Sequence, residues 1–265
     1  MKKRIFAALL ATLMLFSAFA FTGCGKEDNV LVMATNASFP PYEFKDGDNF
    51  AGIDVEIAGK IAEKLGMTLE IKDVEFGSII GGVQSGKFDM GMAGMTVTDE
   101  RLESVNFTSS YATAVQVVIV KADSGYTSVD DFFNLDEEGN WVSVKEGVKI
   151  GVQQDTTGDI YASDTVEKWG FGADNVVRYK TGNEAVLALN AGKITAVIID
   201  NEPAKAYVEQ NEGLTILDGA YADEQYAICI AKDNTELLDK VNKALGELIE
   251  DGTVQSIIDK YIPAE

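Results

Sequence analysis

The chain alternates short apolar runs with segments whose apolar residues recur every three or four positions. Residues 30–35, VLVMAT, form an apolar run that predicts a buried strand. In residues 52–66, Ile53, Ile57 and Ile61 are spaced by four and Gly66 closes the segment, which predicts an amphipathic helix. A strand at 68–74, a short helix at 78–84 and a strand at 88–95 follow. This series is typical of a mostly parallel sheet covered by helices.

A second series of similar size begins after residue 115. It predicts strands at 116–122, 148–153, 175–180 and 194–200, a capped helix start at 127–133, and helices at 156–170 and 182–192. The C-terminal part is helical, with one apolar stripe in residues 234–252 formed by Leu237, Val241, Leu245 and Leu248, and a last short helix at 253–262. Two α/β series in one chain predict two lobes.

The first 23 residues have the pattern of a secretory signal. A basic start precedes the uncharged and mostly apolar run 5–21, and small residues follow it. Phe21-Thr22-Gly23-Cys24 resembles a bacterial lipobox, although leucine is usual where Phe21 stands. We therefore expect a lipid on Cys24 and a tether at 24–29. Ordinary signal cleavage that leaves a free Cys24 is the alternative.

Composition narrows the possible partners and chemistry. The chain has 43 acidic and 22 basic residues, a net charge of -21, and no histidine. An acidic surface repels nucleic acid, so we expect no nucleic-acid partner, and contact with the membrane only through the lipid anchor. Without histidine the chain cannot build histidine triads or histidine metal sites. We expect no metal and no cofactor, and Cys229, inside the apolar YAICIA, as a small core residue.

Candidate ligand contacts stand at the ends of four of the predicted strands. They are Asn36, Phe39 and Tyr42 after the first strand, Gly94, Thr96 and Arg101 at and after the end of the third, Thr156 and Thr157 after 148–153, and Asp200 at the end of 194–200. Ligands of open α/β sheets lie beyond the carboxyl ends of the strands, which favours one shared ligand site. Each residue alone has a plainer interpretation. Arg101 could be a surface charge, Asp200 and the threonines helix caps, and Phe39 a core side chain.

Six segments, in this order, resemble the polar amino acid-binding proteins of ABC importers, the solute-binding proteins of family 3. They are ATNASFPPYEF, GIDVEIAGKIAEKLG, GKFDMGMAGMTVTDERLESVNFTSSY, GVQQDTTGD, EAVLALNAGKITAVIIDNEPA and LLDKVNKALGELIEDGTVQSIIDKYI, and together they span residues 30–262. The resemblance implies an α/β type II periplasmic-binding-protein fold, with two mixed sheets flanked by helices and joined by two hinge strands. It places lobe 1 at 30–111 and 227–265, lobe 2 at 116–222, and hinges near 111–116 and 222–227.

The resemblance also implies a role for each site residue. Arg101 matches the arginine that binds the ligand carboxylate, helped by Thr96, Thr156 and Thr157, and Asp200 matches the acid that pairs with the ligand ammonium, together with the Gly94 carbonyl. Phe39 and Phe76 match the positions that sandwich the ligand side chain, while Asn36 and Gln153 stand where the family selects among side chains. The anion that Arg101 binds would then be the carboxylate of an amino acid.

Two departures bear on which amino acid binds. Asn36 stands where cation-binding members often carry an acid, which favours a neutral polar ligand such as glutamine. Asp155 replaces a glycine that is common before the two threonines, and if it faces the cleft it favours arginine or lysine instead.

The resemblance therefore implies a lipid-anchored receptor on the outer face of the cytoplasmic membrane. It would be a monomer that delivers a polar L-amino acid to an ABC permease and its ATPase. Two alternatives stay open: an enzyme on the same fold, similar to cyclohexadienyl dehydratase and using an acid such as Glu43, or a sensor or adhesin. Fold alone does not decide between them.

Overall fold

The structure, a computed structural model, describes residues 29–263. The predicted signal segment, the lipidation site Cys24 and the tether up to Asp28 lie outside the described residues. Within residues 29–263, no helix is both long enough and apolar enough to cross a membrane.

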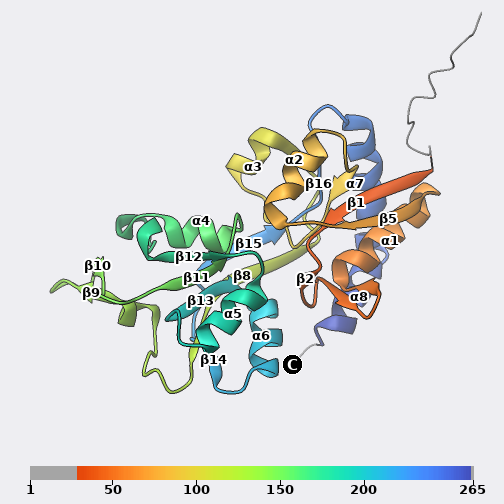
Figure 1. The fold of residues 1–265 in the computed structure, drawn as a ribbon. Helices are drawn as coiled ribbons and strands as arrows, with labels where there is room; N and C mark the ends of the chain where they lie inside the picture. Colours follow the sequence, from red (N-terminus) through yellow and green to blue (C-terminus); the bar gives the residue numbers. More distant parts are fainter. Residues whose placement is uncertain (1–28, 264–265) are drawn as a thin grey trace, which may run out of the picture.

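The first lobe is built on a five-stranded mixed sheet in the order β5-β1-β6-β16-β7. Its strands are β1 (Val30–Thr35), β5 (Thr68–Asp73), β6 (Met90–Gly91), β7 (Val105–Phe107) and β16 (Cys229–Ala231), with β5, β1 and β6 parallel and the other two pairings antiparallel. Helices α1 (Ile53–Leu65), α7 (Thr235–Glu250) and α8 (Thr253–Tyr261) cover one face. Helices α2 (Ile79–Gln84) and α3 (Asp99–Ser104) lie on the other side (Figure 1).

The apolar run of β1 follows from helices on both faces of this sheet. Alternate residues of a strand point to opposite faces. Leu31 and Met33 belong to the cluster that includes α1 and α7, whereas Val32 and Ala34 belong to the cluster that includes α2. The predicted stop of α1 is confirmed, because Gly66 caps the helix with a left-handed φ of 68°, which glycine adopts without steric cost.

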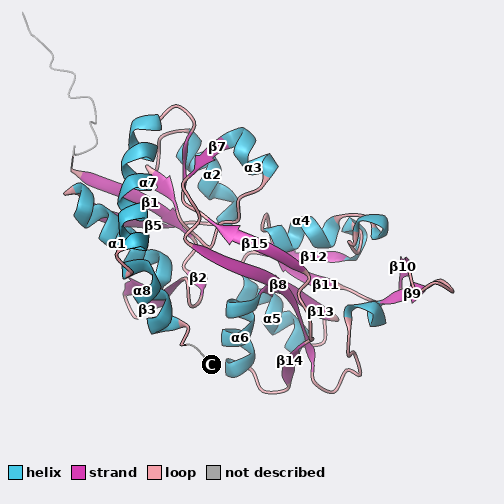
Figure 2. Ribbon diagram, turned by 180° about the vertical axis from the view of Figure 1, so that it is seen from behind, coloured by secondary structure: helices cyan, strands magenta, loops and turns pink. Residues whose placement is uncertain are grey.

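The second lobe carries the sheet β12-β11-β13-β8-β14. Its strands are β11 (Ile150–Gln153), β12 (Val176–Tyr179), β13 (Ala196–Asp200), β14 (Leu214–Ile216) and the long β8 (Ala112–Lys121). Helix α4 (Thr157–Ser163) lies on one face, and α5 (Gly182–Asn190) and α6 (Asn201–Gln210) lie on the other, as Figure 2 shows. The predicted two-lobed α/β architecture is confirmed.

Two antiparallel strands run between the lobes. The first half of β8 pairs with β15 (Ala222–Tyr226), from Gln116 opposite Ala222 to Tyr226 opposite Ala112. The structure extends the predicted strand 116–122 backwards to Ala112 because of this pairing. The hinges near 111–116 and 222–227 stay a prediction.

Local predictions failed where short elements depend on tertiary contacts. The segment 127–133 has the predicted cap, a capping box formed by Ser128 and Asp131, but the helix that follows is only the 3-10 turn η2 (Val129–Phe132). The chain then enters a hairpin of β9 (Phe133–Leu135) and β10 (Trp141–Val144). Phe133 and Trp141 stack at 3.9 Å between ring centroids across that hairpin, which stabilises the strand pairing. The helix predicted at 156–170 ends at Ser163, because Asp164 takes an extended backbone conformation.

Smaller elements complete the fold. They are the three-stranded sheet β2 (Ser38–Phe39), β3 (Glu43–Asp46) and β4 (Asn49–Ala51), and the 3-10 turns η1 (Phe76–Ser78), η3 (Val166–Lys168) and η4 (Ala173–Asn175). Cys229 is fully buried in the first lobe, as predicted for a small core residue.

Candidate ligand-binding site

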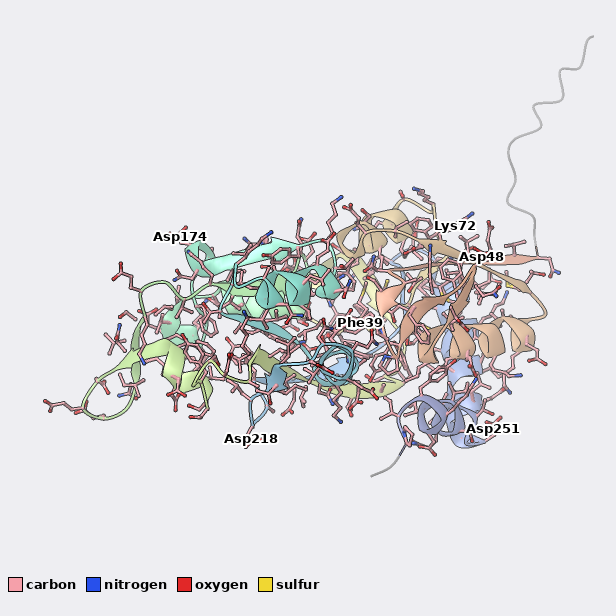
Figure 3. All side chains as sticks on the ribbon, turned by 60° about the horizontal axis from the view of Figure 1, so that its bottom comes forward. Phe39, Asp48, Lys72, Asp174, Asp218 and Asp251 are labelled. Atoms are coloured by element: carbon pink, nitrogen blue, oxygen red, sulfur yellow. The ribbon has the colours of Figure 1, made fainter. Side chains whose placement is uncertain are left out.

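The carboxyl ends of several strands meet at one enclosed cavity between the lobes. It is small, with a volume of about 20 Å³. Twelve residues line it: Asn36, Phe39, Glu43, Phe76, Ala93, Gly94, Thr96, Arg101, Gln153, Thr156, Thr157 and Asp200. Phe39 lies between the two lobes in Figure 3. The structure therefore brings together every side chain that the sequence assigned to ligand contact, except Asp155.

Arg101 enters the cavity from α3 of the first lobe and is 7% exposed. One guanidinium nitrogen, Nη1, donates to the Thr96 carbonyl oxygen at 2.8 Å, and Nη2 donates to the Asp155 carbonyl oxygen at 3.1 Å. The guanidinium carbon lies 5.2 Å from the centre of the Phe76 ring, within range of a cation–π interaction. Burial lowers the pKa of Arg101, while the nearby acid Glu224 acts in the opposite direction. Arg101 is therefore a buried cation of the cavity and not a surface charge.

Asp200 enters from the second lobe, at the end of β13, and is 6% exposed. It occupies the N-cap position of α6, yet its side chain makes no capping hydrogen bond. Instead its Oδ2 accepts a short hydrogen bond from the Tyr226 hydroxyl. Burial, and next the neighbouring carboxyl of Glu224, raise the pKa of Asp200 well above its ordinary value. The side chain of Asp200 therefore does not act as a helix cap, and it is a buried carboxyl group on the cavity wall.

Asn36 and Gln153 meet across the cavity from opposite lobes. Gln153 Nε2 donates to Asn36 Oδ1 at 2.9 Å, and Asn36 Nδ2 donates to the Val74 carbonyl oxygen at 2.7 Å. Ser38 Oγ also donates to Asn36 Oδ1. The buried Gln153 Oε1 has no hydrogen-bond partner among the described residues. The Asn36 oxygen thus accepts two hydrogen bonds and its Nδ2 donates one within the protein, whereas Gln153 Oε1 is an open acceptor.

The two threonines sit where β11 passes into α4. Thr156 caps that helix, accepting from the Asp159 backbone N–H at 3.4 Å, and its hydroxyl donates to the Gln153 carbonyl oxygen. The cap interpretation of Thr156 is correct, and Thr156 lines the cavity as well. Thr157 is 3% exposed, with its hydroxyl 3.5 Å from Gln116 Nε2.

The backbone conformation of Gly94 and its contact with Phe39 require a glycine at this position. Its φ is +50°, and a Cβ placed on it would come within 2.9 Å of the Phe39 ring. Its backbone N–H donates to Asp54 Oδ2 at 2.8 Å, which orients the peptide next to the cavity. Phe39 also packs against Tyr42, with ring centroids 6.2 Å apart, so it contributes both to the core and to the cavity wall.

Asp155 lies outside the cavity wall and instead lines a neighbouring surface groove that also contains Gly77. Its φ is +64°, a conformation that is rare for residues other than glycine but tolerated by aspartate. That backbone places its side chain directly over Gly77, where an added Cβ would come within 2.1 Å of Asp155 Oδ2. Asp155 contributes its backbone carbonyl to Arg101, and its carboxylate is directed out of the site.

Sequence reasoning did not assign the buried acids around the cavity. Glu43, considered only as the acid of an enzyme, lines the wall at 1% exposure, and burial, with Asp54 next to it, raises its pKa well above the ordinary value. Burial also raises the pKa of Asp54, to about 6. Glu224 of β15 was missed entirely. The signal for it was period-two alternation, since Glu224 lies two positions before the inward aromatic Tyr226.

Further contacts join the lobes around the cavity. The Tyr207 hydroxyl of α6 donates to the Ser38 carbonyl oxygen at 2.6 Å, and Lys180 forms an exposed 2.6 Å ion pair with Glu75. Together with the contacts from Arg101 and Gln153, these bonds connect the two lobes in a closed arrangement. Arg101 and Asp200 thus present a cation and a carboxyl group to the same cavity from opposite lobes.

The chain is similar to proteins that bind amino acids. The profile of the bacterial extracellular solute-binding proteins, family 3, matches residues 31–264. The "Arginine-binding extracellular protein ArtP" of Bacillus subtilis is 30% identical over 93% of this chain and 94% of that protein.

Solved structures agree with this similarity. The arginine-, lysine-, histidine-binding protein ArtJ of Geobacillus stearothermophilus is 30% identical, with a TM-score of 0.78 over 89% of this chain and 96% of that one. An ancestral arginine-binding protein bound to glutamine is 36% identical, with a TM-score of 0.76 over 89% and 99% of the two chains. With the profile spanning almost the whole described structure, the chain belongs to the bacterial extracellular solute-binding proteins of family 3.

Proposed function

We propose that the protein binds a polar L-amino acid in the cavity between its lobes and delivers it to an ABC importer. The observation that carries the proposal is the position of Arg101 and Asp200, which reach one buried cavity from different lobes. A guanidinium group forms two parallel hydrogen bonds with a carboxylate, and a buried carboxylate pairs with an ammonium group. An α-amino acid carries both partners on one carbon.

We assign the remaining wall residues around that zwitterion. Thr96, Thr156 and Thr157 would assist Arg101 at the carboxylate, the Gly94 carbonyl would assist Asp200 at the ammonium, and Phe39 and Phe76 would enclose the side chain. Asp155 is left out of this assignment, because its carboxylate lies outside the cavity wall.

The cavity favours a ligand side chain that carries N–H donors. Asn36 uses its amide within the protein, while Gln153 Oε1 lacks a donor and Glu43 adds a buried acid to the wall. Glutamine supplies one such amide and arginine supplies a guanidinium group with more donors. The names of relatives that bind arginine support arginine as the first ligand to test, with glutamine next.

Opening and closing of the lobes would load and release the ligand. In this proposal lobe 1 is 30–111 with 227–265, lobe 2 is 116–222, and β8 and β15 bend where they cross between them. Closure requires that the ligand bind the closed form more tightly than the open form. Contacts from both lobes to one molecule supply that difference.

The position in the cell follows from the N-terminal segment. An exported monomer held by a lipid on Cys24, on the outer face of the cytoplasmic membrane, would pass its ligand to a permease and its ATPase. We propose no catalysed reaction, in keeping with relatives that carry the names of binding proteins. Incubation with arogenate or prephenate, followed by product analysis, tests the enzyme alternative.

A thermal-shift screen of the purified protein tests the binding function. The ligands are the twenty amino acids with cystine, ornithine and citrulline. A specific ligand at about 100 times its Kd adds about 2.7 kcal/mol to the free energy of unfolding. Asp200→Asn, measured in parallel, should lose that stabilisation. No stabilisation of the wild-type protein by any of these compounds would refute the proposed function.

A further inference from the structure

Glu224 is a buried carboxylate on β15, one of the two strands that connect the lobes. It is 4% exposed. Its Oε2 accepts from Thr96 Oγ1 of the first lobe at 3.0 Å and from Gln116 Nε2 of β8 at 3.0 Å. Its other oxygen, Oε1, is buried and has no hydrogen-bond donor among residues 29–263.

The register of the sheet brings Glu224 close to Asp200. Gln116 of β8 pairs with Asp200 of β13 on one side and with Ala222 of β15 on the other. Glu224 lies two residues beyond Ala222 on the same strand, and its neighbouring carboxyl is, after burial, the main reason why the pKa of Asp200 is raised. Asp200 and Glu224 are therefore buried carboxyl groups that both lie next to Gln116, and two carboxyl groups buried side by side hold a proton that isolated carboxyls release.

The surroundings do not neutralise this pair. The titratable and charged groups that face Asp200 or Glu224 are Arg101 from α3, Tyr161 from α4, Tyr226 from β15, Glu43 from β3, and Tyr42 before β3. Arg101 is the cation in this set. Its guanidinium group already donates hydrogen bonds to the Thr96 and Asp155 carbonyl oxygens. In the proposed function it also receives the ligand carboxylate, so a second positive charge is needed beside the carboxyl pair.

We propose that Glu224 is a positioning residue of the ammonium site. Before the ligand binds, Glu224 holds Asp200 in place through one proton that the two carboxyl groups share. The ligand ammonium then takes the place of that proton. The displaced proton passes to the solvent, and the ammonium group then lies against an ionised Asp200, with Glu224 next to Asp200 and outside the cavity wall. This inference rests on the proposed function and deepens it. Because Glu224 also binds Thr96 of the first lobe, it connects the ammonium site with both lobes.

Proton release on binding is the expected signature. Protons and ligand compete for the pair, so affinity should rise with pH wherever the empty cleft holds the shared proton. In that range about one proton leaves for each ligand bound, and at higher pH the dependence levels off. A residue that acted only in packing would leave both quantities unchanged.

The test is titration calorimetry of the wild-type protein and Glu224→Gln with the amino acid found in the screen. Each is measured in two buffers of different ionisation enthalpy, at several values between about pH 5 and pH 8. Glutamine keeps an oxygen for the Thr96 and Gln116 donors but cannot share the proton. The matched control is Asp223→Asn, which alters the adjacent, exposed carboxylate of the same strand.

We expect proton release from the wild type and from Asp223→Asn, and less than about a third of it from Glu224→Gln, with a flatter dependence of Kd on pH. Equal release from Glu224→Gln and wild type would overturn the inference. A wild-type protein that binds the amino acid without releasing protons also overturns the inference about Glu224 and leaves the proposed function intact. Because this result comes from the wild-type protein alone, it holds even if Glu224→Gln does not fold. A wild-type protein that binds no amino acid refutes the proposed function, and this inference with it.

Discussion

Replacing Arg101 by alanine removes the cation that faces the cavity from the first lobe. The side chain is 7% exposed and donates to two backbone carbonyl oxygens. Because the site is buried, bulk water does not replace the lost guanidinium group. The ligand carboxylate would then be buried without a partner, which costs about 2–5 kcal/mol. Kd should rise roughly 30- to 3,000-fold.

Arg101→Lys separates charge from geometry. Lysine keeps the positive charge but cannot form two parallel N–H bonds with a carboxylate. Losing one charged hydrogen bond costs about 1.5–3 kcal/mol, so Kd should rise roughly 10- to 150-fold, less than for alanine.

Calorimetry with the ligand from the screen measures all three proteins, and thermal unfolding confirms that each variant folds. The matched control is Arg178→Ala, which removes an arginine paired with Asp159 at 2.9 Å outside the cavity wall. Its Kd should stay within about threefold of wild type. If folded Arg101→Ala also stays within about threefold, a change of about 0.7 kcal/mol, Arg101 does not bind the ligand.

Three further predictions concern the closed form and the buried acids. Tyr207→Phe removes the hydrogen bond that the Tyr207 hydroxyl donates to the Ser38 carbonyl oxygen between the lobes, so the Kd measured by calorimetry should rise about 2- to 10-fold. An unchanged Kd would argue against a role of this bond in closure. Gly94→Ala should lower both the unfolding temperature and the affinity, since its Cβ would meet the Phe39 ring at 2.9 Å with φ at +50°; a variant as stable as wild type would contradict this. Burial raises the pKa of Asp54 to about 6 from 3.8, so the folded state holds this proton more tightly than the unfolded chain, and the resulting stability is complete below pH 3.8 and lost as the pH rises to about 6. Denaturant titrations at about pH 4 and pH 7 should therefore show a fall in the free energy of unfolding that is smaller by about 2 kcal/mol in Asp54→Asn than in wild type. An equal fall would refute the assignment.

Periodicity alone determined the larger elements. The spacing of Ile53, Ile57 and Ile61 and the glycine that follows predict α1 to within one residue of its observed ends. The apolar run of β1 and the stripe of α7 are equally clear, because each of these elements buries a face along its whole length. Long elements that bury a face are the ones whose pattern survives in the sequence.

The positions of candidate residues along the chain predicted more about the ligand site than the hydrophobic periodicity did. Polar residues after the strand ends pointed to one ligand site, and the structure brings the side chains of Asn36, Arg101 and Asp200 to a single cavity. The physical reason is that the parallel strands of each sheet end at one edge, and those edges of the two lobes meet at the same cavity. Their roles toward a ligand stay predictions.

Only the tertiary structure decided what these side chains face. The conformation of Asp155 at φ +64° directs its carboxylate out of the cavity, and no local pattern encodes that direction. Glu224 reaches Asp200 because β15 pairs with β8 in one register, a contact between residues 24 positions apart that neither segment specifies by itself. Side-chain types and their period are written in the sequence, whereas burial, charge pairing and the state of a proton depend on which surfaces the fold brings into contact.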